Sequence, residues 1–135
     1  MNLKKIEHIG IAVKDLEKSN LLFAALFGKE PYKTEEVKAE DVFVSFFKTG
    51  ETKIELLQAV TENSAIARFI EKKGEGIHHL AFEVDDIKAS MANLKKQGFQ
   101  LLSDEPKEGA DNKLICFLHP KNTNGVLIEI CQEKK

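Results

Sequence analysis

The stretch GIHHLAFEVDDI at residues 76–87 decides the fold, because the chain carries a diverged copy of it near its start. The copy reads IEHIGIAVKDL at residues 6–16. Aligning His8 with His79 also aligns Asp15 with Asp86, without a gap. The chain therefore contains an internal repeat, and each copy has a histidine on its first predicted strand.

A second similarity lies at the end of each copy of the repeat. The segment KIELLQ at residues 53–58 resembles LIEICQ at residues 127–132, and this pairing aligns Glu55 with Glu129. Each half of the chain therefore combines one histidine on its first strand with one glutamate on its last strand.

Strand geometry predicts where the histidines point, because alternate residues of a strand face opposite sides. On the first strand His8 shares its face with Gly10 and Ala12, and on the fifth strand His79 shares its face with Ala81. Small residues beside a polar side chain leave room for a ligand, so we predict a cleft. A hydrogen-bonded core histidine is the alternative for either residue alone. Two histidines and two glutamates at equivalent positions favour a site.

The periodicity predicts an α+β fold of two repeated βαβββ modules within a single domain at residues 1–135. The modules cover about 4–60 and 76–133, and a connecting helix at about 64–73 begins at the cap Ser64. In the first module we predict strands at 6–14, 31–37, 42–47 and around Glu55, and a helix from Asp15 to Gly28 with Leu16, Leu22, Phe23, Leu26 and Phe27 as its apolar positions. In the second we predict strands at 78–85, 99–104, 113–118 and 126–132, and a helix from Asp86 to Gly98.

Composition and charge argue against nucleic-acid binding and against a membrane protein. A net charge of −2 and a pI near 6.1 provide no basic field for nucleic acid. The start of the chain lacks the apolar core of a signal peptide, and no apolar run approaches transmembrane length. Cys116 and Cys131 lack CxxC spacing, which indicates reduced thiols and a cytoplasmic location.

Two imidazoles and two carboxylates form a mixed nitrogen and oxygen donor set that suits a divalent cation. An octahedral cation with these ligands keeps open positions for water or a substrate oxygen, which favours Lewis-acid chemistry over a structural zinc site. Such a metal stabilises negative charge on a carbonyl oxygen when a proton leaves the adjacent carbon, and a nearby glutamate is the base. The residues alone leave hydrolysis, oxygen chemistry and a two-histidine, one-carboxylate redox site open.

The repeat resembles the vicinal oxygen chelate superfamily, whose paired βαβββ modules form a curved sheet that holds a metal. Within it, the chain is similar to the methylmalonyl-CoA epimerase family from Ile6 to Gln132. The motifs that carry the similarity are GIHH (76–79), VDDI (84–87), SDEPK (103–107), FLHPK (117–121) and GVLIE (125–129).

The resemblance implies an isomerase that interconverts the R and S forms of methylmalonyl-CoA by metal-assisted proton transfer through an enolate. It implies metal ligands at His8, Glu55, His79 and Glu129, with cobalt as the metal and nickel, manganese or zinc as alternatives. Glu129 is also expected to take part in proton transfer. Some members use a second carboxylate on the third strand, but residues 42–47 contain none, and Glu40 just before them is a poor substitute.

The runner-up is glyoxalase I, a lactoylglutathione lyase with a similar ligand set. Bacterial forms tend to carry Arg and Asn where this chain has Ala12 and Ala59, which argues against glutathione as a substrate. A third possibility is a non-catalytic small-molecule binding protein of the same fold, although such binders generally lack the ligand set.

The expected partners are a CoA thioester and a second copy of the chain. Two polar loops, at 105–112 and 119–125, are long enough to contact a ligand, and Lys107 and Lys121 can meet CoA phosphates. Solvated turns are the alternative for both loops. A homodimer is expected because the exposed sheet edges of this fold often pair with another copy.

Overall fold

The computed structural model describes residues 1–134 and divides the chain into two compact units. The terminal unit contains Met1–His8 and the chain from His79 onward, and the central unit contains Ile9–His78. Strand β1 (Leu3–Ala12) and strand β5 (Gly76–Val84) each run from one unit into the other. The boundary falls at the two predicted ligand histidines, so both histidines belong to the terminal unit.

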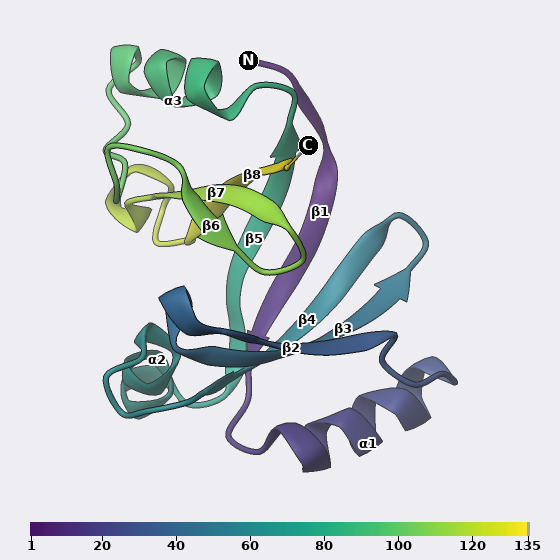
Figure 1. Cartoon of the computed structure of the whole chain (residues 1–135). Coiled ribbons are helices and arrows are strands. Elements are labelled where there is room, and N and C mark those ends of the chain that lie inside the picture. The colour runs from purple at the N-terminus through teal and green to yellow at the C-terminus, as the bar shows by residue number, and fades with distance from the viewer. Residues whose placement is uncertain (135) are drawn as a thin grey trace. The chain divides into compact units, whose positions relative to one another are not determined.

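The predicted order of elements is confirmed, since βαβββ occurs twice (Figure 1). The first set is β1, α1 (Leu16–Phe27), β2 (Lys33–Val37), β3 (Val42–Thr49) and β4 (Thr52–Ala59), with the short 3-10 helix η1 (Lys38–Glu40) before β3. Helix α2 (Ala65–Lys73) connects the sets. The second set is β5, α3 (Ile87–Lys96), β6 (Lys107–Gly109), β7 (Lys113–Leu118) and β8 (Ile128–Glu133), with the 3-10 helix η2 (Pro120–Asn122) before β8.

In the central unit, β2, β3 and β4 form an antiparallel meander. Helix α1 covers one face of it through a cluster that includes Phe23, Phe47 and Leu56. Glu55 lies on the opposite face, because it alternates with Ile54 and Leu56 along β4. Its cross-strand partner on β3 is Phe46.

In the terminal unit, β5 pairs with β8 in parallel, and β8, β7 and β6 continue as antiparallel neighbours. Helix α3 packs on one face of β7 and β8 (Figure 1). Met91 and Leu94 of the helix belong to the same buried cluster as Cys116 and Ile130 of these strands. The opposite face carries Glu129 and its neighbours, because side chains alternate along a strand.

The predicted strand at 99–104 is wrong. Leu101 forms only an isolated bridge with Leu118, and the strand that pairs with β7 is β6, through Lys107 and Ile115. The backbone N–H of Gln100 donates to the side chain of Asn122 at 2.8 Å and is therefore not used in pairing with another strand.

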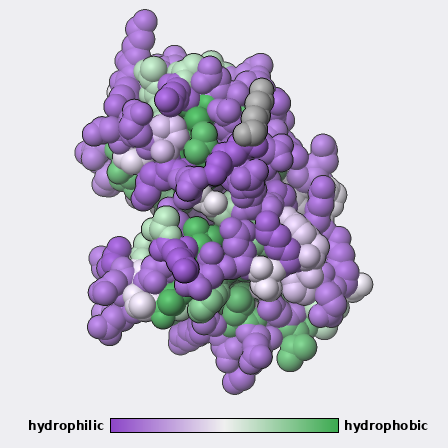
Figure 2. All heavy atoms as spheres, viewed as in Figure 1, coloured by the Kyte–Doolittle hydropathy of each residue, from purple (hydrophilic) through white to green (hydrophobic). Residues whose placement is uncertain are grey.

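Helix α1 begins after Asp15 and ends at Gly28 as predicted, and Gly28 adopts a left-handed φ of 72°. Two of its predicted apolar positions are wrong, however, because Leu22 and Leu26 are 66% and 70% exposed. The predictions for Phe23 and Phe27 are confirmed, because both lie on the inward face and both rings pack against Phe47. The face seen in Figure 2 is mostly hydrophilic, with smaller hydrophobic patches.

Among residues 1–134, none of the helices combines the length and the apolar composition that crossing a membrane requires.

Candidate metal centre

Three of the four predicted ligands meet inside the terminal unit. His8 comes from β1, His79 from β5 and Glu129 from β8, and all three are buried, with exposures of 4%, 5% and 3%. The parallel register of β5 and β8 pairs Ala81 with Glu129, which brings Glu129 close to His79, two residues before Ala81 on β5. This packing follows the parity predicted from the sequence.

The ligand atoms of these residues converge closely. His8 Nε2 lies 3.0 Å from His79 Nε2, and Glu129 Oε1 lies 3.3 Å from His79 Nε2. Glu129 Oε2 lies 3.7 Å from His8 Nε2 and has no hydrogen-bond partner within the described part of the chain. A buried carboxylate oxygen without a partner is costly, which indicates that the site is built for a further positive or donating group.

The donor set and spacing fit a divalent cation. Metal–ligand distances of about 2.0–2.2 Å place neighbouring ligand atoms of an octahedral site about 3 Å apart. The separations of 3.0, 3.3 and 3.7 Å in the structure are close to this spacing. Two imidazole nitrogens and a carboxylate are also the chemistry that such cations accept.

Phe117 provides an apolar wall beside the cluster. It is the cross-strand partner of Glu129, and its ring meets the His79 ring edge to face, with centroids 5.4 Å apart. The His8 and His79 rings are also nearly perpendicular, with centroids 5.1 Å apart. The apolar wall limits access of water and strengthens electrostatic interactions in the site.

The fourth predicted ligand, Glu55, belongs to the central unit. It is 3% exposed on β4 and lies opposite Phe46. Its role as a metal ligand remains a prediction. Glu40, the poor substitute for a second carboxylate, is half-buried at the end of η1 in the same unit.

Sequence reasoning missed two charged residues that support the cluster. Glu7 Oε1 lies 2.7 Å from His8 Nδ1, and Glu7 Oε2 lies 3.9 Å from the Nζ of Lys113. Glu7 and Lys113 are 2% and 6% exposed. A signal was present in the sequence, since Glu7 occupies the apolar side of β1 in parity with Ile9 and Ile11.

Both cysteines are unpaired and buried, in agreement with the prediction of reduced thiols. Burial raises the pKa of the Cys131 thiol far above its ordinary range, and the negative charges of Glu129 and Glu7 raise it further. Burial also raises the pKa of Cys116. Cys131 lies two residues from Glu129 along β8 and packs with Ala81 and Ile115 as a small apolar residue.

The polar loops predicted to contact a ligand contain short regular elements. Strand β6 lies inside 105–112, and η2 lies inside 119–125. The His119 ring accepts a hydrogen bond from the N–H of Lys121 at 3.1 Å and so caps η2. Lys107 and Lys121 are both exposed.

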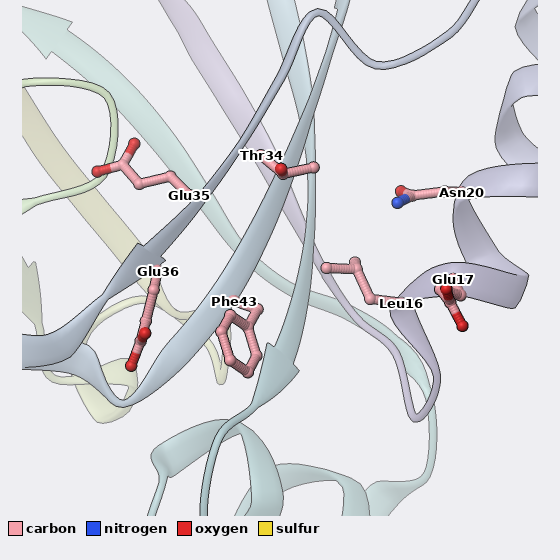
Figure 3. A pocket seen from close by; sticks show the side chains of 7 residues that line it. All are labelled: Leu16, Glu17, Asn20, Thr34, Glu35, Glu36 and Phe43. Carbon is pink, nitrogen blue, oxygen red and sulfur yellow. The ribbon is translucent and has the colours of Figure 1, made fainter.

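A surface groove of about 420 Å³ lies in the central unit (Figure 3). Leu16 and Asn20 reach into it from α1, and Thr34 faces them from β2. Apolar, polar and acidic side chains line this groove. They belong to Leu16, Glu17, Asn20, Thr34, Glu35, Glu36 and Phe43. It contains none of the predicted ligands, so it is not the metal site.

Comparison with known proteins agrees with this geometry. Residues 7–117 match the model of the glyoxalase/bleomycin resistance protein/dioxygenase superfamily, and the chain belongs to that superfamily. The methylmalonyl-CoA epimerase of Homo sapiens is 41% identical over 97% of this chain and 75% of its own length. The ethylmalonyl-CoA/methylmalonyl-CoA epimerase of Cereibacter sphaeroides is 42% identical over 95% of this chain and 97% of its own.

A solved structure extends the similarity to the fold. A variant of the Streptomyces coelicolor methylmalonyl-CoA epimerase, in complex with 2-nitronate-propionyl-CoA, has a TM-score of 0.93 and 34% identity. The alignment covers 99% of this chain and all of that one. Within the superfamily, the chain belongs to the methylmalonyl-CoA epimerase family.

Proposed function

We propose that the protein is an isomerase that interconverts the R and S forms of methylmalonyl-CoA by moving a proton at the second carbon of the acyl group. The observation that carries the proposal is the buried Glu129 carboxylate. It lies against two imidazole nitrogens, and one of its oxygens makes no hydrogen bond within residues 1–134. Full-length similarity to epimerases supports the choice of reaction and substrate.

His8, His79 and Glu129 hold a divalent cation in this proposal, and Glu55 completes the ligand set. Cobalt is the proposed metal, with nickel, manganese or zinc as alternatives that the same donor atoms accept. When bound, the cation supplies a Lewis acid that offsets negative charge on a carbonyl oxygen. The superfamily and the convergent donor atoms support a divalent metal.

Glu129 carries the proton in this proposal. Its buried carboxylate is within reach of any group that lies against His8 and His79, and one oxygen has no other hydrogen bond among the described residues. The Phe117 ring packs against the His79 ring and limits the access of bulk water to the cluster, which strengthens electrostatic interactions there. The α-proton of a thioester is only weakly acidic, so this transfer depends on a site in which developing negative charge is already matched.

The CoA part of the substrate is proposed to lie along the loops at 105–112 and 119–125. The exposed ammonium groups of Lys107 and Lys121 can pair with phosphates there. A CoA ligand is present in the Streptomyces coelicolor relative, whose complex contains 2-nitronate-propionyl-CoA.

We further propose a cytoplasmic homodimer. The buried, unpaired cysteines are typical of a reducing compartment. Three exposed leucines on α1, Leu21, Leu22 and Leu26, offer apolar surface that a second copy can cover.

The reaction is tested by isotope exchange in deuterated water. The cobalt-loaded protein is incubated with one epimer of methylmalonyl-CoA, and separately with the hemithioacetal of methylglyoxal and glutathione. We expect deuterium at the second carbon of the CoA ester while the epimers equilibrate. Lactoylglutathione formation without exchange into the CoA ester would instead indicate glyoxalase I, and inertness toward both would favour a binding role.

A further inference from the structure

A line of buried charge extends from the metal cluster into the terminal unit. It runs from His8 to Glu7 and from Glu7 to Lys113, and none of these side chains is more than 7% exposed. Charged side chains are rarely buried unless they are paired, so an arrangement of this kind has a structural or functional cause.

Glu7 connects the two ends through its two oxygens. The 2.7 Å separation between Glu7 Oε1 and His8 Nδ1 requires a hydrogen on the nitrogen, because a carboxylate only accepts. The other ring nitrogen of a neutral His8 therefore carries a lone pair. That nitrogen, Nε2, is the one that lies 3.0 Å from His79 Nε2.

Lys113 lies on the other side of Glu7. Its Nζ is 3.9 Å from Glu7 Oε2 and 3.9 Å from Glu133 Oε1. The Glu133 side chain is 75% exposed, whereas that of Glu7 is 3% exposed. An exposed carboxylate is screened by water, so Glu7 is the main counter-charge of the buried ammonium group.

We propose that Glu7 is a positioning residue that holds His8 with its Nε2 lone pair directed into the metal site, and that Lys113 acts through Glu7. The proposal rests on the assignment of His8 as a ligand in the proposed function. Carboxylates that orient a ligating histidine fix its tautomer, and their loss typically weakens metal binding by about 10–100-fold. The buried ammonium group restrains the Glu7 carboxylate and balances its charge.

The first test uses the metal-free protein. Nitrogen-15 NMR of the histidine rings at pH 8 reports which His8 nitrogen carries the hydrogen. We expect the Nδ1–H tautomer in the wild type and a shift toward the Nε2–H tautomer in Glu7→Met. A wild-type His8 ring that already carries its hydrogen on Nε2 would overturn the proposal.

The second test measures cobalt affinity by competition with a chelator. The double variant Glu7→Met, Lys113→Met removes both buried charges and keeps apolar volume, a change that buried ion pairs often tolerate. We expect it to fold, as judged by circular dichroism, and to bind Co²⁺ about 10–100-fold more weakly than the wild type. Lys113→Arg keeps the charge and should stay within a few-fold of wild type.

Glu133→Gln is the matched control, because it removes the exposed carboxylate next to Lys113. We expect wild-type cobalt affinity and a wild-type His8 ring spectrum. A loss of affinity equal to that of the double variant would overturn the proposal, since the effect would then come from charge in general and not from Glu7.

His8→Ala separates this inference from the proposed function. If His8→Ala loses Co²⁺ while the double variant binds it with wild-type affinity, His8 is a ligand and Glu7 does not position it. If His8→Ala retains wild-type Co²⁺ binding, the ligand assignment itself fails, and the inference fails with it.

Discussion

The two βαβββ halves anchor their helices in the same way but use the helix faces differently. Asp15 accepts a hydrogen bond from Lys18 N at 3.1 Å, and Asp86 accepts one from Ala89 N at the same distance. Each helix start therefore has an equivalent side-chain cap.

A glutamine from the last strand of each half provides a second anchor. Gln58 Oε1 accepts from the backbone N–H of Leu16 at 2.6 Å, and Gln132 Oε1 accepts from that of Ile87 at 2.7 Å. The first turn of each helix is thereby tied to the strand that bears the glutamate.

The helix faces differ sharply. Helix α3 buries four residues, Ile87, Ser90, Met91 and Leu94. Helix α1 buries only Ala24, and it exposes Leu21, Leu22 and Leu26. The repeat thus preserves the contacts that place the backbone, while α1 leaves leucine side chains exposed on its outward face, the surface assigned to a second copy in the proposed function.

The two last-strand glutamates are also placed alike and can be compared directly. Each is buried and lies opposite a phenylalanine, since Glu55 pairs with Phe46 and Glu129 pairs with Phe117. Only Glu129 is assigned proton transfer in the proposed function, so the pair offers a test of whether the halves share the chemistry.

The largest expected effect is that of Glu129→Gln. Loss of a general acid or base typically lowers the rate by about 10²–10⁴-fold, so we expect kcat for epimerisation to fall by that amount with cobalt at saturation. The matched variant Glu55→Gln should weaken Co²⁺ binding but change the saturated kcat by less than about 10-fold, because proton transfer is assigned to Glu129. Equal losses of kcat in both variants would show that the two glutamates share the proton transfer.

A second prediction concerns His78, which precedes His79 in the second half as Glu7 precedes His8 in the first. The His78 ring meets the Phe69 ring at 5.0 Å, and burial lowers its pKa to about 4. The unfolded chain has a pKa of about 6.5 for histidine, so it binds the proton more readily than the folded protein. The contribution of neutral His78 to stability is therefore complete above pH 6.5 and is lost as the pH falls toward 4.

His78→Phe removes this dependence. The lowering of the pKa by about 2.5 corresponds to at most about 3.4 kcal/mol, at about 1.36 kcal/mol for each pKa unit. Urea unfolding at pH 7 and pH 4.5 should show the wild type losing about 2–3 kcal/mol more than the variant. Parallel losses in the two proteins would mean that His78 is not the group responsible.

Most of the secondary-structure elements were predictable from the sequence because of the internal repeat. The aligned caps Asp15 and Asp86, and the glycine that ends α1, mark helix boundaries locally, so these were predictable. Strand β6 was not, because it forms within the polar loop at 105–112 by pairing Lys107 with Ile115, whereas the more apolar residues 99–104 make only an isolated bridge. The exposure of Leu22 and Leu26 depends on Phe23 and Phe27 filling the inward face, which helical spacing alone does not decide.

The site was predictable to the extent that strand parity defines it. Parity and the repeat identified His8, His79 and Glu129, and the structure brings these three together. Glu7 and Lys113 were missed because their pairing joins strands β1 and β7, and a charge on an apolar strand face does not name its partner. The role of Glu55 as a ligand remains a prediction.

The smallest expected effects test the two glutamine anchors. Gln132→Ala removes the acceptor for the backbone N–H of Ile87. Because Ile87 is only 2% exposed, water cannot replace the lost hydrogen bond. Gln58→Ala removes the acceptor for Leu16, which is only half-buried, so water can replace the lost bond. We expect losses in the free energy of unfolding of about 1–2 kcal/mol for Gln132→Ala and about 0.5–1 kcal/mol for Gln58→Ala. Urea unfolding measures both, and amide hydrogen exchange at Ile87 and Leu16 should speed up only in the corresponding variant. Equal losses would mean that burial of the donor does not set the strength of these anchors, and that the two halves are more alike than their helix faces indicate.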